Sequence, residues 1–264
     1  MLCLLRRQPE GHQVAVPFLA ARPVHRACGQ STRKALRVTA VDAWERYAEN
    51  AQPRRAVNAA GAMTWFNWTQ YPDHGPNESV LGDVRGRNVL ELGSGSGANL
   101  AHLATLGAYC TGVDLAPTRE AAARQRWGHQ SYLTFVTADV VDYLTNTLAS
   151  FDIVYSVFGA VWFIDPVILL PLVRKRINSG GALVFSHLPA AEQETHSNRM
   201  IKKWNYPAEE WVELLLNEGF NATTEIIPAP AADQPGTLLV RARAVTFEPT
   251  LSTARRMSPD AMTA

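Results

Sequence analysis

Val89-Leu-Glu-Leu-Gly-Ser-Gly-Ser-Gly-Ala98 is the stretch that decides the fold. A short apolar run leads into glycines at positions 93, 95 and 97, and a helical pattern follows. Glycine adopts positive φ angles at little steric cost, so this spacing predicts a tight turn between a strand and a helix. The first N–H groups of that helix would face a ligand, and Glu91 precedes the turn as a hydrogen-bond acceptor. The pattern therefore predicts a site for a nucleoside-like cofactor.

Two classes of cofactor fit this loop. Gly93-x-Gly95-x-x-Ala98 satisfies the dinucleotide fingerprint, and Asp114 lies about 20 residues on, where a ribose-binding acid is expected. The alternative reading starts from Glu91, which precedes three alternate glycines. In that form the segment resembles motif I of the class I S-adenosylmethionine-dependent methyltransferases. The nicotinamide alternative stays open on the loop alone.

The resemblance continues over roughly residues 85–245, in the order of elements that this family has. Four further segments carry it: the second strand with its terminal acid, the third strand with its terminal acid, the fourth-strand motif, and the turn before the fifth strand. These are residues 110–115, 135–140, 151–156 and 178–183. Ser179 replaces the proline of the family's Pro-Gly-Gly turn, but both glycines are kept.

The resemblance implies a role for several individual residues. Asp114 would accept hydrogen bonds from the ribose hydroxyls, Asp139 from the adenine amine, and Glu91 would hold the methionine ammonium. The expected cofactor-binding residues are Glu91, Gly93, Ser94, Gly95, Gly97, Asp114, Leu115, Asp139, Val140 and Ser156. Each of the three acids has a simpler alternative, which is a solvated or helix-capping carboxylate at a strand end.

Methyl transfer from a sulfonium needs neither a metal nor a covalent intermediate. In-line alignment of the acceptor contributes roughly 7–11 kcal/mol in such reactions, and aromatic faces stabilise the sulfonium charge. The aromatic candidates for the sulfonium and the acceptor are Trp65, Trp68, Tyr71, Phe158 and Trp162, for which ordinary packing is the alternative.

A catalytic base is needed if the acceptor is a hydroxyl or a protonated amine. His187, at the predicted carboxyl end of the fifth strand, is the first candidate because imidazole titrates near neutral pH. The alternative is a histidine that bonds only a backbone carbonyl. His74 is a weaker candidate, and His196 and Tyr206 belong to a polar stretch that would cover the acceptor pocket.

Composition excludes several other classes of function. The net charge of +1 gives no electrostatic footprint for nucleic acid, and no apolar run approaches the roughly 18 residues that a membrane span needs. The three cysteines show no metal-ligand spacing, so no metal is expected, and they favour a reducing, cytoplasmic location. The oligomeric state stays undetermined.

Element patterns predict an α/β fold, a doubly wound and mostly parallel seven-stranded sheet with a C-terminal antiparallel hairpin and an N-terminal helical cap. The expected strands are residues 88–92, 109–114, 133–138, 151–156, 182–187, 220–227 and 237–246, and Thr118 is expected to cap the second helix of the core. We expect an extended or disordered arm at 1–40, with a transit peptide as the alternative. A methyltransferase domain would follow at 41–247 (cap 41–84, Rossmann-like core 85–247), and a tail at 248–264.

The predicted activity is S-adenosylmethionine-dependent methyl transfer to an O, N or C nucleophile of a small-molecule metabolite. Aromatic residues around 65–71 and 158–163 favour a partly apolar acceptor. Ser156-Val-Phe-Gly159 lacks the Asn-Pro-Pro-Tyr type of tetrapeptide, which disfavours amino-methylation of DNA or of glutamine. An NAD(P)-dependent oxidoreductase and a catalytically inactive, cofactor-binding regulatory protein remain as alternatives.

Overall fold

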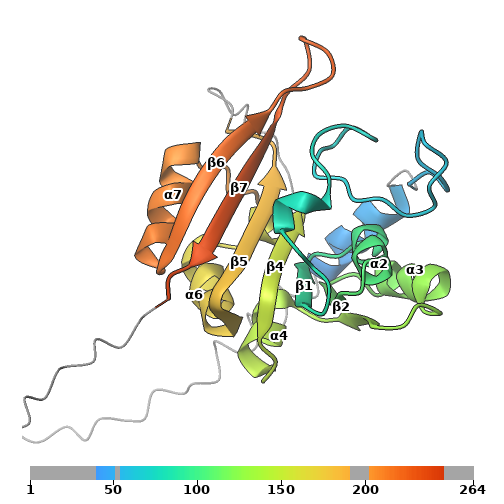
Figure 1. Cartoon of the computed structure of the whole chain (residues 1–264), viewed down its shortest axis with the longest axis horizontal. Coiled ribbons are helices and arrows are strands. Elements are labelled where there is room, and N and C mark those ends of the chain that lie inside the picture. Colours follow the sequence, from blue (N-terminus) through green and yellow to red (C-terminus); the bar gives the residue numbers. More distant parts are fainter. Residues whose placement is uncertain (1–39, 51–53, 191–201, 247–264) are drawn as a thin grey trace, which may run out of the picture. The chain divides into compact units, whose positions relative to one another are not determined.

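Seven strands form the sheet of the computed structural model, which describes residues 40–50, 54–190 and 202–246. The strands are β1 (Asn88–Leu92), β2 (Tyr109–Asp114), β3 (Leu133–Thr137), β4 (Phe151–Val157), β5 (Ile177–His187), β6 (Phe220–Ile227) and β7 (Thr237–Ala244). Their order across the sheet is β3-β2-β1-β4-β5-β7-β6 (Figure 1). Strands β1 to β5 pair in parallel, whereas β7 pairs antiparallel with both β5 and β6. The predicted fold class is therefore confirmed.

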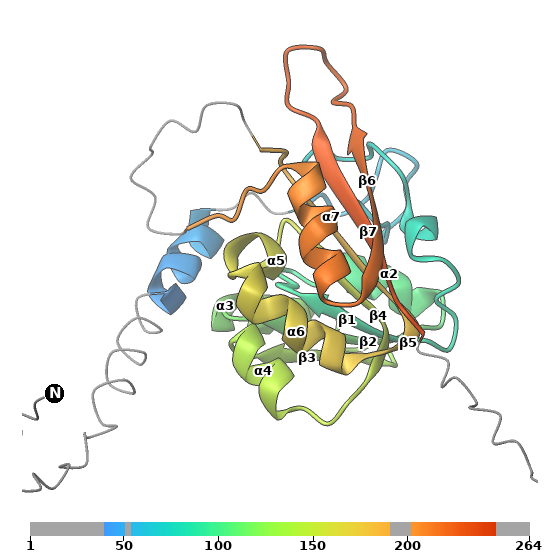
Figure 2. The ribbon, with the colours of Figure 1, turned by 90° about the vertical axis from the view of Figure 1, so that its left-hand side faces the viewer.

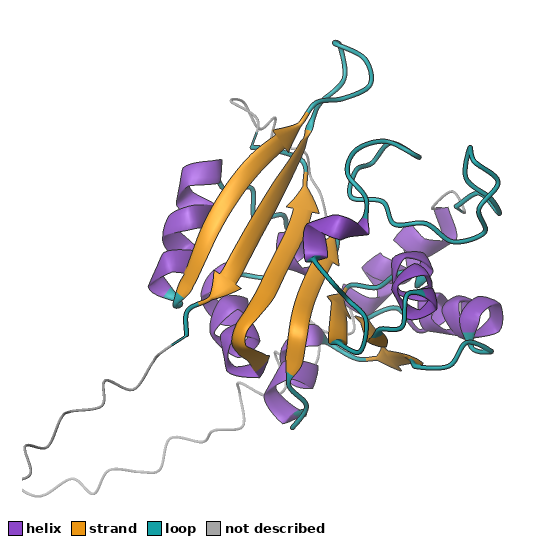
Figure 3. Cartoon of the chain, viewed as in Figure 1, coloured by secondary structure: helices purple, strands orange, loops and turns teal. Residues whose placement is uncertain are grey.

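Helices cover both faces of this sheet (Figure 3). They are α2 (Ala98–Thr105), α3 (Pro117–Trp127), α4 (Val140–Asn146), α5 (Ala160–Phe163), α6 (Pro166–Arg176), α7 (Ala208–Asn217) and the 3-10 turn η1 (Glu78–Leu81), and residues 40–50 are also helical. One apolar core lies between the sheet and α4, α6 and α7, the helices that face the viewer in Figure 2. A second core lies between the sheet and α2, α3 and η1.

The central strands are apolar on both faces, because successive residues of a strand point alternately into the two cores. In β1, Leu90 and Leu92 pack into the first core, whereas Val89 packs into the second. The chain builds β1, β2 and β3 outward in one direction and then returns to place β4 on the other side of β1. Such a reversal of strand order leaves a crevice at the carboxyl ends of the strands, and ligands bind there in open α/β sheets.

Two local predictions are corrected by the structure. Thr118 does not cap α3, which begins at Pro117 after Ala116; instead Thr118 donates to Glu45 from the helix at 40–50. Strand β5 begins at Ile177 rather than at residue 182, because residues 178–181 bulge while pairing with β4 continues on both sides. The elements η1, α4 and α5 were not predicted, because each has seven residues or fewer and is too short to show helical periodicity.

The terminal segments of the predicted domain organisation lie outside the described residues, apart from position 40, and so do Cys3, Cys28 and His196. The boundaries at 40, 84 and 247 therefore stay predictions. The described residues all belong to one unit of the chain, Thr39–Ala264. Within them, no helix is both long and apolar enough to span a bilayer.

Candidate functional site

A cleft of about 540 Å³ opens at the carboxyl ends of β1, β2 and β4. Most of the predicted cofactor-binding residues line it, although they come from three separate segments of the chain. Those that do are Glu91, Gly93, Ser94, Gly95, Asp114, Leu115, Asp139 and Val140. Gly97 and Ser156 are not among the residues that line the cleft. Gly97 is the N-cap of α2, and the buried Ser156 hydroxyl donates to Leu92 O at 2.7 Å.

The glycine loop has its shape because two of its positions leave no room for a side chain. Gly93 has a φ of +80°, and a Cβ there would lie 2.7 Å from the backbone nitrogen of Ala160. Gly97 has a φ of +68°, and a Cβ there would lie 2.4 Å from the Phe135 ring. A larger residue would clash with the Ala160 backbone at position 93 and with the Phe135 ring at position 97. The loop is therefore held against the strand ends, where its backbone faces the cleft.

Asp114 ties the glycine loop to the end of β2. Its Oδ2 accepts from Gly95 N at 2.8 Å, and its Oδ1 accepts from Ala116 N at 3.0 Å. Burial raises the pKa of Asp114, although these two backbone bonds and the nearby Arg119 oppose the increase. Each carboxylate oxygen has a second lone-pair direction, so Asp114 can hold the loop and accept bonds from a ligand diol.

Asp139 follows β3, where it both caps α4 and lines the cleft. Its Oδ1 accepts from Val141 N at 2.8 Å and from Asp142 N at 3.2 Å, which makes it the N-cap of α4. The cap uses Oδ1 alone, and the half-buried residue also lines the cleft. The helix-cap alternative is thus realised without removing Asp139 from the candidate site.

Glu91 is the most perturbed acid of the cleft. Its side chain is buried, with 3% relative exposure, and Oε2 has no hydrogen-bond partner among the described residues. Desolvation raises the pKa of Glu91 well above its usual value; the Tyr155 phenol and Arg54 lower it, and Asp114 raises it further. Buried polar atoms nearly always have a partner, so an orphaned oxygen at a cleft wall indicates a donor that arrives with the ligand.

Arg54 is a cleft residue that no sequence pattern indicated. Its Nη1 donates to Asn99 Oδ1 at 2.9 Å and its Nη2 donates to Trp65 O at 2.7 Å, while its guanidinium lies 4.0 Å from the centroid of the Trp65 ring. Desolvation lowers the pKa of Arg54 to about 10, so it remains a cation at neutral pH. The cleft thus contains a fixed cation whose charge is felt at Glu91.

Of the five aromatic candidates, Phe158 alone is among the described residues that line the cleft. Trp65 stacks beneath Arg54, the Tyr71 hydroxyl donates to Pro235 O at 2.8 Å, and the Trp162 indole donates to the Asn205 side chain. The further candidate, Trp68, is fully buried. The aromatic residues that do line the cleft with Phe158 are Trp44, Tyr47 and Phe163, from the helix at 40–50 and from α5.

His187, the first candidate for the base, does not line the cleft. It is fully buried, and its ring lies 5.5 Å from that of Trp162 and 5.6 Å from that of Trp211, centroid to centroid. Its Nδ1 lies 2.6 Å from Leu188 O, so the neutral ring carries its proton on Nδ1. Desolvation lowers the pKa of His187 to about 4. The packing corresponds to the alternative reading, a histidine bonded to a backbone carbonyl.

His74, the weaker candidate base, and Tyr206, expected over the acceptor pocket, also have structural partners. His74 Nε2 lies 2.7 Å from Pro228 O, and Tyr206 packs edge-on against Trp211. No group of three or more histidine, cysteine, aspartate or glutamate side chains with metal-binding geometry occurs in the described part of the chain.

Comparison with known proteins places this geometry in a family. Residues 90–185 match the family described as a methyltransferase domain. The chain contains a class I, Rossmann-like methyltransferase domain. This match supports the predicted class I S-adenosylmethionine-dependent methyltransferase, and residues 90–185 carry its domain. No curated protein matches the chain.

Solved structures share the fold of this methyltransferase at low sequence identity. The 1,6-didemethyltoxoflavin-N1-methyltransferase of Burkholderia thailandensis is 20% identical, with a TM-score of 0.56 over 86% of this chain and 93% of that one. The magnesium protoporphyrin IX methyltransferase of Synechocystis is 15% identical, with a TM-score of 0.52 over 82% and 99%. An S-adenosylmethionine-dependent methyltransferase of Mesorhizobium loti is 23% identical, with a TM-score of 0.50 over 62% and 94%.

Proposed function

We propose that this methyltransferase binds S-adenosylmethionine in the cleft and transfers its methyl group to an O, N or C nucleophile of a small molecule. One observation carries the proposal: the cleft brings together acids from the ends of three consecutive strands around a glycine loop. These are Glu91, Asp114 and Asp139. The donor supplies an electrophilic methyl carbon, so the protein needs mainly to align the two reactants.

Each acid matches a different part of the methyl donor. Asp114 is placed for the ribose diol, whose O–H groups form short, charge-assisted bonds to a carboxylate. Asp139 would accept from the adenine amine, and the Val140 backbone would contact the ring, since both residues line the cleft. Glu91 is placed for the ammonium of the methionine end, which would pair its orphaned Oε2.

Arg54 extends this assignment to the carboxylate of the same methionine end. Its charge acts on Glu91, so the cleft holds a cation near a carboxyl group that can pair with an incoming ammonium. A zwitterionic amino acid presents the complementary pair of charges. Asn99 holds the guanidinium in place through its Oδ1 and ties α2, which follows the glycine loop, to this end of the cleft.

A small-molecule acceptor is supported by the size and lining of the cleft and by the kinds of proteins that share the fold. A cleft of about 540 Å³ with aromatic walls is typical of sites for small ligands. One neighbour is bound to a small heterocyclic acceptor, 1,6-didemethyltoxoflavin, and to S-adenosylhomocysteine. The balanced net charge of +1 fits an acceptor other than nucleic acid. A cytoplasmic location is part of the proposal, because the spacing of the three cysteines favours a reducing compartment.

The sheet itself disfavours a nicotinamide oxidoreductase. Dinucleotide-binding folds continue the strand order 3-2-1-4-5 with a sixth parallel strand. Here the place beside β5 is occupied by β7, which runs antiparallel. The second mononucleotide-binding half that a dinucleotide needs is therefore incomplete.

Calorimetry with S-adenosylhomocysteine, the demethylated product of the donor, tests the proposal. We expect micromolar binding by the wild-type chain and a loss of at least about tenfold in Asp114→Asn, since about 1.4 kcal/mol of pairing corresponds to tenfold. Asp165→Asn is the matched control, because Asp165 caps α6 and asparagine caps equally well.

The possible outcomes separate the proposal from its two alternatives. Absence of S-adenosylhomocysteine binding at millimolar concentration refutes the cofactor assignment, and NADH binding in its place favours the oxidoreductase. Methylated product from a metabolite panel with labelled donor excludes an inactive regulatory protein. If the labelled donor binds but no member of a broad panel is methylated, the regulatory alternative is favoured.

A further inference from the structure

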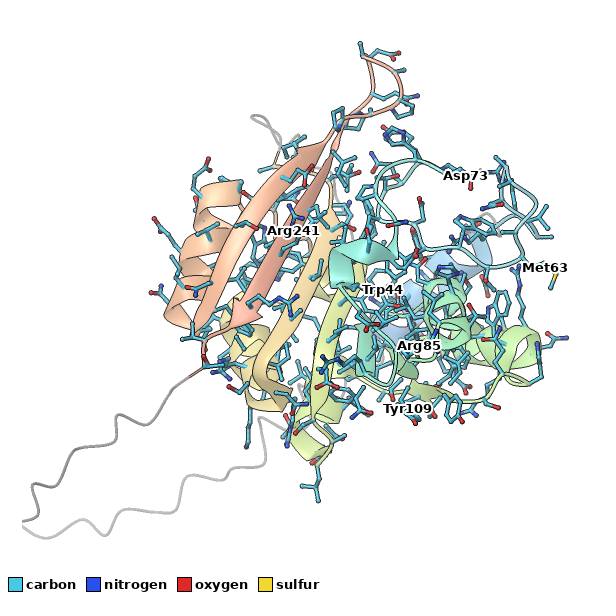
Figure 4. The ribbon with its side chains drawn as sticks, in the orientation of Figure 1. Trp44, Met63, Asp73, Arg85, Tyr109 and Arg241 are labelled. Carbon is cyan, nitrogen blue, oxygen red and sulfur yellow. The ribbon has the colours of Figure 1, made fainter. Side chains whose placement is uncertain are left out.

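Part of the cleft wall carries aromatic side chains that the methyl donor does not require. Trp44 comes from the helix at 40–50 (labelled in Figure 4) and packs edge-on against Phe163 of α5, with ring centroids 4.6 Å apart. Tyr47, one turn further along the same helix, lines the cleft with them, and Phe158 contributes a fourth ring. Flat aromatic walls of this kind favour a flat, partly apolar ligand.

Lys202 adds an ammonium group to this part of the cleft. Lys202 is exposed and lines the cleft, and its Nζ lies 3.5 Å from the centroid of the Trp204 ring. Its position follows from how the segment 202–206 is anchored to α5. Trp204 N donates to Trp162 O at 2.8 Å, the Trp162 indole donates to the Asn205 side chain, and Lys203 lies over the Trp162 ring.

The aromatic wall therefore carries a positive charge at a defined place. The acids of the cleft lie at the ends of β1, β2 and β3, and Glu45, on the same helix as Trp44, is engaged by Thr118 of α3. An ammonium is a compact point charge that pairs well with one singly charged anion.

We propose that the methyl acceptor is an aromatic carboxylate, with its ring against Trp44, Phe158 and Phe163 and its carboxylate held by Lys202. The proposal rests on the proposed function, because it assigns the acceptor of the same cleft. Lys202 is then a specificity-determining residue, and its role is to select the anionic member among acceptors of similar shape.

The test uses the full chain saturated with S-adenosylhomocysteine and measures binding by calorimetry. The probes are naphthalene and indole rings, each carrying a carboxylate, a primary amide or a methylammonium group at the same position. The wild-type chain should bind the carboxylate of at least one ring system about fivefold more tightly than the amide, as expected for an exposed ion pair. It should bind the methylammonium least.

Variants at position 202 test whether the Lys202 ammonium causes the preference for the carboxylate probe. Lys202→Gln should reduce affinity for the carboxylate about fivefold and leave the amide unchanged, and Lys202→Glu should favour the methylammonium probe. Lys175→Gln, an exposed lysine of α6, is the matched control and should change nothing. Affinity for S-adenosylhomocysteine should be the same in all four chains.

The outcomes separate this inference from the proposed function. Equal affinity for carboxylate and amide, or no carboxylate binding on either ring, overturns the assignment of the acceptor and leaves the methyl donor site intact. If Lys202→Gln weakens S-adenosylhomocysteine as strongly as the probes, Lys202 serves the cofactor and the inference is wrong. If the wild-type chain does not bind S-adenosylhomocysteine, the proposed function itself fails at the first step.

Discussion

Replacing His187 by phenylalanine should make the protein less sensitive to acid. The folded chain lowers the pKa of His187 from 6.5 to about 4 by burying it among aromatic rings. The unfolded chain therefore binds the proton more readily, so stability is retained above pH 6.5 and lost as the pH falls toward 4. Between pH 7 and pH 5 this group alone costs about 2 kcal/mol, at 1.36 kcal/mol for each pKa unit.

Urea unfolding at pH 7 and pH 5, followed by tryptophan fluorescence, measures the effect. His187→Phe keeps a flat ring between Trp162 and Phe185, and other titrating groups cancel when the two chains are compared. The wild-type chain should lose about 2 kcal/mol more than the variant over this interval. Parallel losses in both chains would refute the buried, neutral state of His187. A variant that folds but loses methyl transfer at saturating donor would restore His187 as the base.

Three further predictions concern the cleft. Gly93→Ala should weaken S-adenosylhomocysteine binding by at least about tenfold, because the added Cβ meets Ala160 N. Gly61→Ala is the control, since Gly61 has the same φ of +80° but open space around it, and it should not change the affinity. Equal affinities of the two variants in calorimetry would contradict the packing argument. Glu91→Gln should weaken S-adenosylhomocysteine binding but raise the unfolding temperature at pH 8. The raised pKa of Glu91 means that the fold favours the protonated carboxyl, so its contribution to stability is lost as the pH rises, and glutamine avoids this loss. A lower Tm of the variant in scanning calorimetry would oppose this reasoning. Arg54→Met should weaken the same ligand in calorimetry, whereas Arg55→Met, beside the exposed Asp73, should leave it unchanged; the reverse order would remove Arg54 from the site.

The cofactor end of the cleft was predictable because its signals are local. Glycine spacing determines which backbone angles the loop can adopt, and short apolar runs identify β1, β2 and β4. Parallel strands bring their carboxyl ends to one edge of the sheet, so Glu91, Asp114 and Asp139 are expected together from their positions alone. The structure then places all three at one cleft.

Other residues had no local signal of their place. Trp65 has the same aromatic character as Phe158, yet it stacks on Arg54 while Phe158 lines the cleft. His187 ends a strand just as a catalytic histidine would, but α7 and α5 bring Trp211 and Trp162 over it. Sequence periodicity specifies which face of its own element a residue takes, but it does not specify what another element places over that face.

The sequence alone therefore determined the order of strands and helices, the glycine loop and the acids that follow the strands. Each of these depends on backbone conformation over a few neighbouring residues. Only the tertiary structure decided that Arg54, Trp44 and Lys202 join the cleft and that His187 does not. Those outcomes depend on contacts between segments far apart in the chain, whose energy comes from packing and desolvation after the sheet has formed.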